Sequence, residues 1–198
     1  MNSSTHVLIL AGGKGQRLWP WSRPGCYKPF LPLLGQRSLL DATIERALSL
    51  VSPDRIHLVG SSEFVRESAP FLWIEEPQPR NTGPAIYHAA RSIHEQDPSA
   101  TLLVFPADHR VLDPDAFRRG LRDTLIEVDA APQHFWLHGT VEVPDSSFGF
   151  IVPETAGESG SVACFIEKPD PDLALSLAAQ GAIRNTGIFC FKAALLID

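Results

Sequence analysis

The chain has 198 residues, of which 44% are hydrophobic and 20% are charged, and its formal net charge at pH 7 is −6. These values predict a single compact domain with a sizeable core, and they argue against a general nucleic-acid-binding protein, which would carry a basic face. The sequence has neither an apolar run near the roughly 20 residues of a membrane-spanning helix nor the start of a secretory signal, so we expect a cytoplasmic protein without a membrane or nucleic-acid partner.

The first two thirds of the chain alternate between short apolar runs and segments with apolar residues at helical spacing. Continuous apolar runs of this length are typical of strands that are covered on both faces. The predicted strands are residues 6–10, 55–60, 71–76 and 101–105, and the predicted helices are residues 38–50, 62–69, 82–96 and 115–130. We expect Ser38 to cap the first helix, and Asn81 or Thr82 to cap the third. The alternation predicts an α/β, Rossmann-like fold with a mostly parallel twisted sheet and helices on both faces.

The rhythm changes after residues 134–141. Residues 148–153 and 161–169 are closely spaced strand patterns without a helix between them, which predicts a small antiparallel flap. A helix is predicted to end at Gly181, and residues 183–191 are predicted to return as a strand. We therefore expect one domain with a nucleotide-binding half at about residues 1–130 and a second half at about residues 131–198.

Cysteine usage excludes two classes of small fold. Cys26, Cys164 and Cys190 are odd in number and lack the spacing of metal ligands, which argues against a disulfide framework and against a zinc site. Cys164 and Cys190 lie in apolar runs, so we expect both to be small core residues.

A glycine-rich loop follows the first predicted strand, in the sequence LILAGGKGQRLWPWSRPGCYKPFLPL. Its spacing fits neither the dinucleotide fingerprint, whose third glycine position holds Leu18, nor the P-loop. Gly12, Gly13 and Gly15 would let backbone amides approach an anion closely. Arg17 and Lys28 would add positive charge beside phosphoryl oxygens. The alternative is a tight turn with solvated cations.

The run LLVFPADH places Asp108 directly after the predicted strand 101–105. Ligands of open α/β sheets collect at the carboxyl ends of the strands, and a carboxylate there suits Mg²⁺, which takes oxygen ligands and bridges phosphates. The alternative is an Asx turn or a cap before the next helix. On the residues alone, both interpretations of Asp108 remain open.

The segment LILAGGKGQRLWPWSR resembles the signature loop of the sugar-nucleotide pyrophosphorylases, and its Leu-Trp-Pro and Ser-Arg steps resemble the mannose-1-phosphate guanylyltransferase branch. The resemblance implies a nucleotide-diphospho-sugar transferase fold and a reaction of GTP with mannose 1-phosphate that uses Mg²⁺. It also implies that Arg17 and Lys28 bind and activate the nucleotide phosphates. Because the Pro-Ala-Asp-His run matches the family without a break, it further implies that Asp108 is a ligand of Mg²⁺. The nucleotide-binding residues that it implies, besides these two, are Leu10, Ala11, Gly12, Gly13, Gly15, Arg80, Asn81, Thr82, Pro106 and Asp108.

The segment EPQPRNTGPAI, residues 76–86, resembles the part of this family that closes on guanine and ribose. The resemblance implies that groups around Arg80, Asn81 and Thr82 read the edge of the base. From the residues alone the same segment is a helix start, with a proline in the first turn. The two interpretations are compatible, because a helix N-terminus is a favourable neighbour for an anion.

Three later segments, FGFI, FIEKP and RNTGIF, resemble the sugar-binding motifs of the family in the same order. The resemblance implies that Gly149 lets the sugar lie against the backbone and that Glu167 accepts hydrogen bonds from sugar hydroxyls. Lys168 would approach the sugar phosphate, and Asn185 would bond a hydroxyl. Arg184 replaces the usual tryptophan, and both tyrosines of the family's first motif are phenylalanines here, so the identity of the sugar stays open. On residue type alone, Glu167 and Lys168 could equally be a solvated strand end.

Family members carry a second metal-binding aspartate further along the chain, followed by more sheet. We therefore expect a chain that is truncated at its C-terminus or a short relative, which binds nucleotide better than it turns it over. Two alternatives remain open: a transferase for another sugar phosphate, cyclitol phosphate or nucleoside triphosphate, and a non-catalytic nucleotide-binding relative. The expected partners are GTP or another nucleoside triphosphate and a sugar 1-phosphate, and a homodimer is compatible with either alternative.

Overall fold

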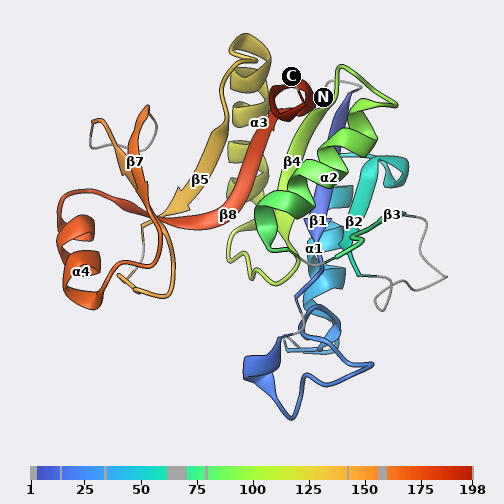
Figure 1. Cartoon of the computed structure of the whole chain (residues 1–198), viewed down its shortest axis with the longest axis horizontal. Helices are drawn as coiled ribbons and strands as arrows, with labels where there is room; N and C mark the ends of the chain where they lie inside the picture. Colours follow the sequence, from blue (N-terminus) through green and yellow to red (C-terminus); the bar gives the residue numbers. More distant parts are fainter. Residues whose placement is uncertain are drawn as a thin grey trace. The chain divides into compact units, whose positions relative to one another are not determined.

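The computed structural model (Figure 1) describes residues 4–13, 15–33, 35–61, 71–78, 80–141, 143–155 and 160–197. The helix predicted at residues 62–69 lies outside the described residues. The chain forms two compact units. The first unit consists of Met1–Trp136 and Phe189–Asp198, and the second unit is Leu137–Ile188.

The first unit is built on parallel strands in the order β3-β2-β1-β4. These strands are β1 (Thr5–Leu10), β2 (Ile56–Gly60), β3 (Leu72–Glu75) and β4 (Thr101–Pro106). All residues of β2, and all of β4 except Pro106, are buried, as expected for strands that are covered on both faces. The end of β8 (Ile183–Lys192) adds an antiparallel strand beside β4, where Phe189 is the register partner of Val104. The predicted parallel strands and the returning strand are confirmed.

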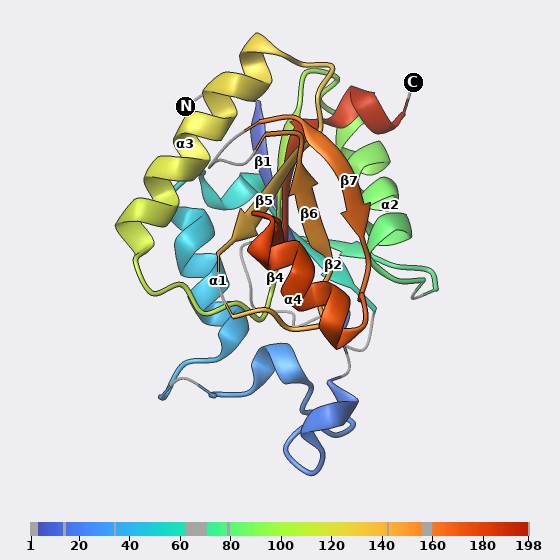
Figure 2. The same cartoon turned by 90° about the vertical axis from the view of Figure 1, so that its left-hand side faces the viewer.

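Helices cover both faces of this sheet, with α2 on one face and α1 and α3 on the other (Figure 2). They are α1 (Leu39–Leu48), α2 (Thr82–His94) and α3 (Pro114–Ala130). Ile86 and Ile93 of α2 share a buried cluster with Leu8 and Val104 of the strands. The doubly wound α/β fold is therefore confirmed.

The starts of two helices differ in how they are capped. Ser38 Oγ accepts a hydrogen bond from the Asp41 amide at 3.0 Å, and Asp41 Oδ2 accepts one from the Ser38 amide at 3.1 Å. This capping box confirms Ser38 as the N-cap of α1. The N-cap of α2 is Asn81, with Thr82 already helical, and among the described residues the Asn81 side chain makes no cap hydrogen bond. Of the two predicted caps, Asn81 is therefore confirmed as the N-cap residue, although its side chain makes no cap hydrogen bond among the described residues, and Thr82 is wrong.

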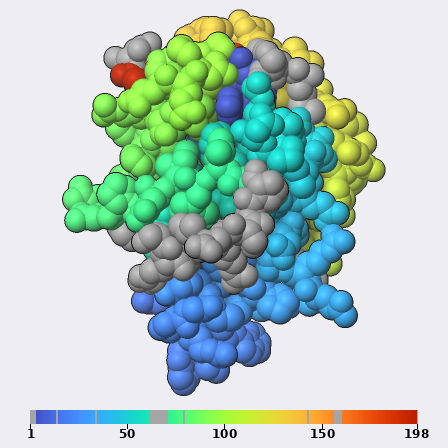
Figure 3. Space-filling model, turned by 90° about the vertical axis from the view of Figure 1, so that its right-hand side faces the viewer, coloured from blue at the N-terminus to red at the C-terminus, as the bar shows by residue number. Residues whose placement is uncertain are grey.

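The strand order creates a switch point between β1 and β4, because β2, the strand that follows β1 in the chain, lies on the side of β1 away from β4. Leu10 and Pro106, the last residues of these two strands, are register partners. The segment 15–33 after β1 and the turn after β4 therefore begin at the same edge. Figure 3 shows the segment 15–33 in blue at the lower end of the first unit.

The second unit is antiparallel. Its elements are β5 (Trp136–Thr140, which starts at the last residue of the first unit), β6 (Phe150–Pro153), β7 (Val162–Ile166), α4 (Pro171–Ala179) and the first part of β8. β6 pairs with β7 on one side and with β8 on the other, and β5 also pairs with β8. Phe150, Ala174, Leu177 and Ala182 form its buried cluster. This arrangement confirms the predicted antiparallel flap.

The three cysteines are all free, and their burial differs. Cys190 is buried in β8, as expected, and burial raises the pKa of its thiol to about 12. Cys164 is exposed, so its prediction as a core residue is wrong. It lies on β7, whose neighbours from Val162 to Phe165 are exposed as well. Within the described residues, no helix has the length and apolar character needed to cross a bilayer.

Candidate functional site

The glycine-rich loop leaves the sheet with its backbone held by both neighbouring strands. The Ala11 amide donates to the Val59 carbonyl at 2.8 Å, and the Leu10 carbonyl accepts from the Ala107 amide at 3.2 Å. Gly13 is exposed, and a Cβ placed on it would meet no described atom within 4 Å. The loop thus starts in a fixed direction and then presents open backbone, which is what an anion-binding loop requires.

Gly15 turns the chain in the left-handed region, with φ 63° and ψ 34°, at the N-cap of η1 (Gln16–Leu18). A Cβ on Gly15 would collide with the Cβ of Lys28, the first residue of η2 (Lys28–Phe30). Both the backbone conformation and the close approach of Lys28 therefore require glycine. Arg17 is exposed within η1.

Lys28 Nζ forms an ion pair with Asp108 Oδ2 across 80 positions of the sequence. The two side chains are 36% and 31% exposed, so the pair is accessible from solvent at the edge of the sheet. Asp108 lies in the turn directly after β4, as the sequence predicted. Two of the expected site residues are thus brought together, whereas among the described contacts Arg17 makes none with Asp108.

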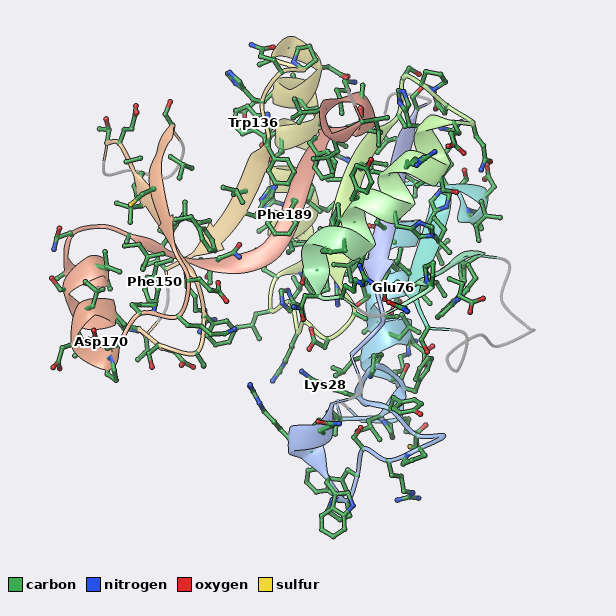
Figure 4. All side chains as sticks on the ribbon, viewed as in Figure 1. Lys28, Glu76, Trp136, Phe150, Asp170 and Phe189 are labelled. Carbon is green, nitrogen blue, oxygen red and sulfur yellow. The ribbon has the colours of Figure 1, made fainter. Side chains whose placement is uncertain are left out.

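Glu76 is a further acidic residue at this edge, which the residues predicted for the site did not include. It follows β3, and its residue surface is 9% exposed. A Cβ on Gly12 would lie 2.7 Å from Glu76 Oε2, so the glycine is what leaves room for the carboxylate. Burial raises the pKa of Glu76, and the nearby His88 opposes this shift. Figure 4 labels Glu76 and Lys28, which both lie near the carboxyl-terminal end of β1.

Arg80, Asn81 and Thr82 are exposed at the start of α2. The Arg80 guanidinium donates to Gln78 Oε1 at 2.8 Å. Asn81 has φ 71° and ψ −174°, a backbone region that is nearly restricted to glycine and costs about 1–3 kcal/mol in other residues. Strain of this kind is concentrated at ligand sites, which is compatible with the predicted role of the segment.

The four residues that the sequence assigned to a sugar phosphate lie together in the second unit. The backbone amide of Asn185 donates to the Gly149 carbonyl at 2.8 Å. Gly149 is buried, and a Cβ on it would lie 2.8 Å from Glu167 Oε2 and would collide with the Phe165 ring. Lys168 Nζ lies 2.9 Å from Glu167 Oε1, and the two side chains are well exposed. An acid, a cation and an amide are therefore grouped around a position that must be glycine.

Aromatic and basic side chains border this group. The guanidinium carbon of Arg184 lies 4.5 Å from the centre of the Phe148 ring, within the range of a cation–π contact. The residue that replaces the family's tryptophan is therefore held on the residue that replaces its first tyrosine. Such a surface could still pack against a sugar, but it offers a different pattern of hydrogen-bond donors.

The described residues fit a magnesium ion through one protein ligand. They contain no group of three or more histidine, cysteine, aspartate or glutamate side chains that could hold a metal. Asp108 is an accessible carboxylate at the carboxyl end of β4, next to a lysine that would also attract phosphate. Mg²⁺ is commonly bound by one or two carboxylates together with substrate phosphates and water, so this donor set is sufficient for a nucleotide-bound ion.

Residues 6–198 match the family model for nucleotidyl transferases. A mannose-1-phosphate guanylyltransferase from Sinorhizobium fredii is 34% identical over 96% of this chain and 39% of its own length. The xanthan biosynthesis protein XanB from Xanthomonas campestris is 33% identical over 96% of this chain and 43% of its own length. This chain therefore spans less than half the length of these curated relatives.

A solved structure agrees with these relatives. The crystal structure described as a mannose-1-phosphate geranyltransferase from Thermus thermophilus has a TM-score of 0.87 and 32% sequence identity, and the match covers 98% of this chain and 58% of that chain.

Proposed function

Because the chain belongs to the nucleotidyl transferase family, we propose that it joins GTP to mannose 1-phosphate to give GDP-mannose and pyrophosphate. The observation that carries this proposal is the ion pair of Lys28 with Asp108 at the edge where the glycine-rich loop begins. A cation, a carboxylate and open backbone amides are together the groups that a magnesium nucleotide needs.

The chemistry needs positioning and charge neutralisation rather than a protein nucleophile. A phosphate oxygen of mannose 1-phosphate attacks the α-phosphorus of GTP in line. The new P–O bond forms as the bond to the bridging oxygen of the β-phosphate breaks, and its electron pair leaves with pyrophosphate. The attacking group is already an anion, so no general base is required.

The residues of the first unit would hold the nucleotide. The amides of Gly12, Gly13 and Gly15 would donate to phosphate oxygens, and Lys28 and Arg17 would neutralise the charge that develops on them. Asp108 would hold Mg²⁺, which when bound supplies further positive charge at the phosphates. In the second unit, Glu167, Lys168 and Asn185 would bind the sugar phosphate.

Glu76 would select the base. A carboxylate accepts hydrogen bonds from both N–H groups that guanine presents on its Watson–Crick edge, whereas adenine presents an acceptor at the equivalent ring nitrogen. Its burial beside Gly12 supports this role, because a ligand on that loop would reach a carboxylate with little competing water.

Glu76→Gln should reduce the preference for GTP over ATP by about 10-fold, since one charged hydrogen bond becomes neutral. Equal preference in the variant and the parent would exclude Glu76 from this role.

The proposal is tested by mixing the chain with GTP, Mg²⁺ and mannose 1-phosphate and measuring pyrophosphate release together with GTP binding. We expect GTP to bind and pyrophosphate to appear slowly. A panel of other nucleoside triphosphates and of other sugar and cyclitol phosphates identifies the preferred pair. If neither pyrophosphate release nor GTP binding is detected at high protein concentration, the proposal is wrong.

A second candidate is a nucleotide-binding protein without turnover. It is favoured by the absence, among the described residues, of a cluster of three or more potential metal-ligating side chains that would include Asp108. It predicts tight GTP binding with no pyrophosphate, even with mannose 1-phosphate in excess. In both cases the proposed setting is the cytoplasm, with small-molecule partners and a homodimer as an assembly to be measured.

A further inference from the structure

The turn that carries Asp108 is held from α1 by hydrogen bonds to the carbonyls on both of its sides. Thr43 Oγ1 lies 3.3 Å from the Ala107 carbonyl oxygen, and the Arg46 guanidinium donates to the His109 carbonyl at 3.0 Å. The Ala107 amide is held in turn by the Leu10 carbonyl of β1 at 3.2 Å. The peptide group before Asp108 and the peptide group after His109 are therefore both held by hydrogen bonds.

Thr43 and Arg46 act on this turn as one connected group. They are three positions apart in α1, so they lie on the same side of the helix. The Arg46 guanidinium donates to Thr43 Oγ1 at 2.6 Å, and the Thr43 hydroxyl also lies 3.0 Å from the Leu39 carbonyl of its own helix. Thr43 is 1% exposed, so loss of its hydroxyl would remove a buried hydrogen-bond partner from this group.

Partial burial of the Arg46 guanidinium has an energetic cost, and the formation of α1 does not require this burial. The side chain is half-buried, and burial lowers the pKa of its guanidinium. Arg37, which precedes α1, shows the usual alternative, because it is exposed and pairs with Glu45 at 2.5 Å. A half-buried arginine whose Nη2 donates to both a hydroxyl and a carbonyl fixes these two groups relative to one another.

We propose that Thr43 and Arg46 are positioning residues that set the direction of the Asp108 carboxylate toward the metal nucleotide. This inference rests on the proposed function, which gives Asp108 its ligand. The carboxylate is joined to the fixed backbone through only two rotatable bonds, so the direction of the turn decides where its oxygens lie. Partners that orient a metal ligand typically change metal affinity by about 10–100-fold when they are removed.

The test uses matched substitutions in the metal-free and the Mg²⁺-containing protein. Thr43→Val keeps the shape of the side chain and removes the hydroxyl, and Arg46→Met removes the donors. Thr124→Val and Arg91→Met are the controls. Thr124 is also a buried helix threonine, which donates to its own helix at the Gly120 carbonyl, and Arg91 is an exposed arginine paired with Glu95.

Two quantities are measured for each variant. The first is the Mg²⁺ gain, which is the ratio of the GTP dissociation constants without and with Mg²⁺. The second is the hydrogen-exchange rate of the Asp108 and His109 amides without metal or nucleotide. We expect Thr43→Val and Arg46→Met to lower the Mg²⁺ gain by about 10-fold and to speed amide exchange, while GTP affinity without Mg²⁺ stays within about twofold.

Two more conservative variants are used in case Thr43→Val or Arg46→Met unfolds the chain. Thr43→Ser should restore the gain, and Arg46→Lys should restore it only in part, because an ammonium lacks the planar group. An unchanged Mg²⁺ gain with unchanged exchange, or an equal loss in the controls, would overturn the inference. If the parent has no Mg²⁺ gain, or Asp108→Asn keeps it, the proposed function fails instead, and amide exchange alone then decides whether Thr43 and Arg46 fix the turn.

Discussion

The two units form their candidate sites by different means. In the first unit, the loop after β1 and the turn after β4 leave buried parallel strands, so the backbone of the sheet fixes where they begin. In the second unit, Glu167 and Lys168 are exposed side chains after a short strand that is itself largely exposed. The first site is therefore set mainly by the fold, whereas the second depends on local contacts between side chains and Gly149.

This difference predicts which properties each unit controls. Changes at the edge of the first unit should alter nucleotide and metal binding with little effect on sugar-phosphate affinity. Changes in the second unit should alter sugar-phosphate affinity with little effect on nucleotide and metal binding.

The largest effect is expected when the ion pair of the first unit is broken. Lys28→Met or Asp108→Asn should weaken GTP binding in Mg²⁺ by about 100-fold, because a charged interaction with the phosphates or the metal is lost. Isothermal titration measures the dissociation constant. Arg37→Met, which breaks an exposed ion pair outside the site, is the control and should stay within about twofold. A Lys28→Met variant with parental affinity would contradict the assignment.

Acid should destabilise the first unit through His57. Burial lowers the pKa of His57 to about 4, and its ring nitrogen lies 2.9 Å from that of His6. The unfolded chain, with a histidine pKa near about 6.5, binds a proton that the folded chain does not bind in this interval. The free energy of unfolding should therefore fall by up to about 3 kcal/mol as the pH is lowered from about 6.5 to about 4.

Urea unfolding at several pH values measures this slope, and His57→Gln should flatten it. Burial also lowers the pKa of His138 in the second unit, so a smaller acid effect should persist in that variant. A slope that His57→Gln leaves unchanged would show that the acid sensitivity arises elsewhere.

The glycines of the loop should differ sharply from one another. Gly15→Ala should lower the free energy of unfolding by about 2 kcal/mol, because alanine is strained at this φ and its Cβ meets Lys28. Gly13→Ala should leave stability nearly unchanged, because the space around Gly13 is open. Thermal unfolding compares the two variants, and an equal loss in both would mean that the loop is packed differently.

The smallest effect is expected in the second unit. Glu167→Gln should raise the Michaelis constant for mannose 1-phosphate by about 10-fold, since one charged hydrogen bond to a hydroxyl becomes neutral. The dissociation constant of GTP should stay within about twofold. A loss of GTP binding in this variant would contradict the claim that the first unit binds the nucleotide and the second unit binds the sugar phosphate.

The sequence predicted most of the described helices and strands because these elements have clear local signals. Buried runs such as β4 and the Ser38 cap of α1 depend on residues close together in the chain, and both are confirmed. The apolar run around Cys164 predicts a core position, but among the described strands β7 pairs with β6 alone and leaves that run exposed. An edge strand cannot be told from a central one by its own residues.

For the candidate sites, too, the sequence predicts residues but not the tertiary contacts between them. The residues of the glycine-rich loop and Asp108 could be named from motifs, but their contacts depend on tertiary structure. The ion pair of Lys28 with Asp108 joins positions 80 residues apart, and the positive φ of Asn81 has no signal in residue type beyond the tolerance of asparagine. Glu76 could have been found, since it is an acidic residue at the end of a predicted strand at the ligand-binding edge. Thr43 and Arg46 follow only from the packing of α1 on the turn.

The central claim is that the amides of Gly12, Gly13 and Gly15 face the phosphates of a magnesium nucleotide. The most direct test is a titration of the ¹⁵N-labelled chain with GTP and Mg²⁺, followed by the NMR signals of these three amides. We predict that all three shift and saturate together, and that Asp108→Asn removes the part that depends on Mg²⁺. Saturating GTP that leaves all three signals in place would contradict the account.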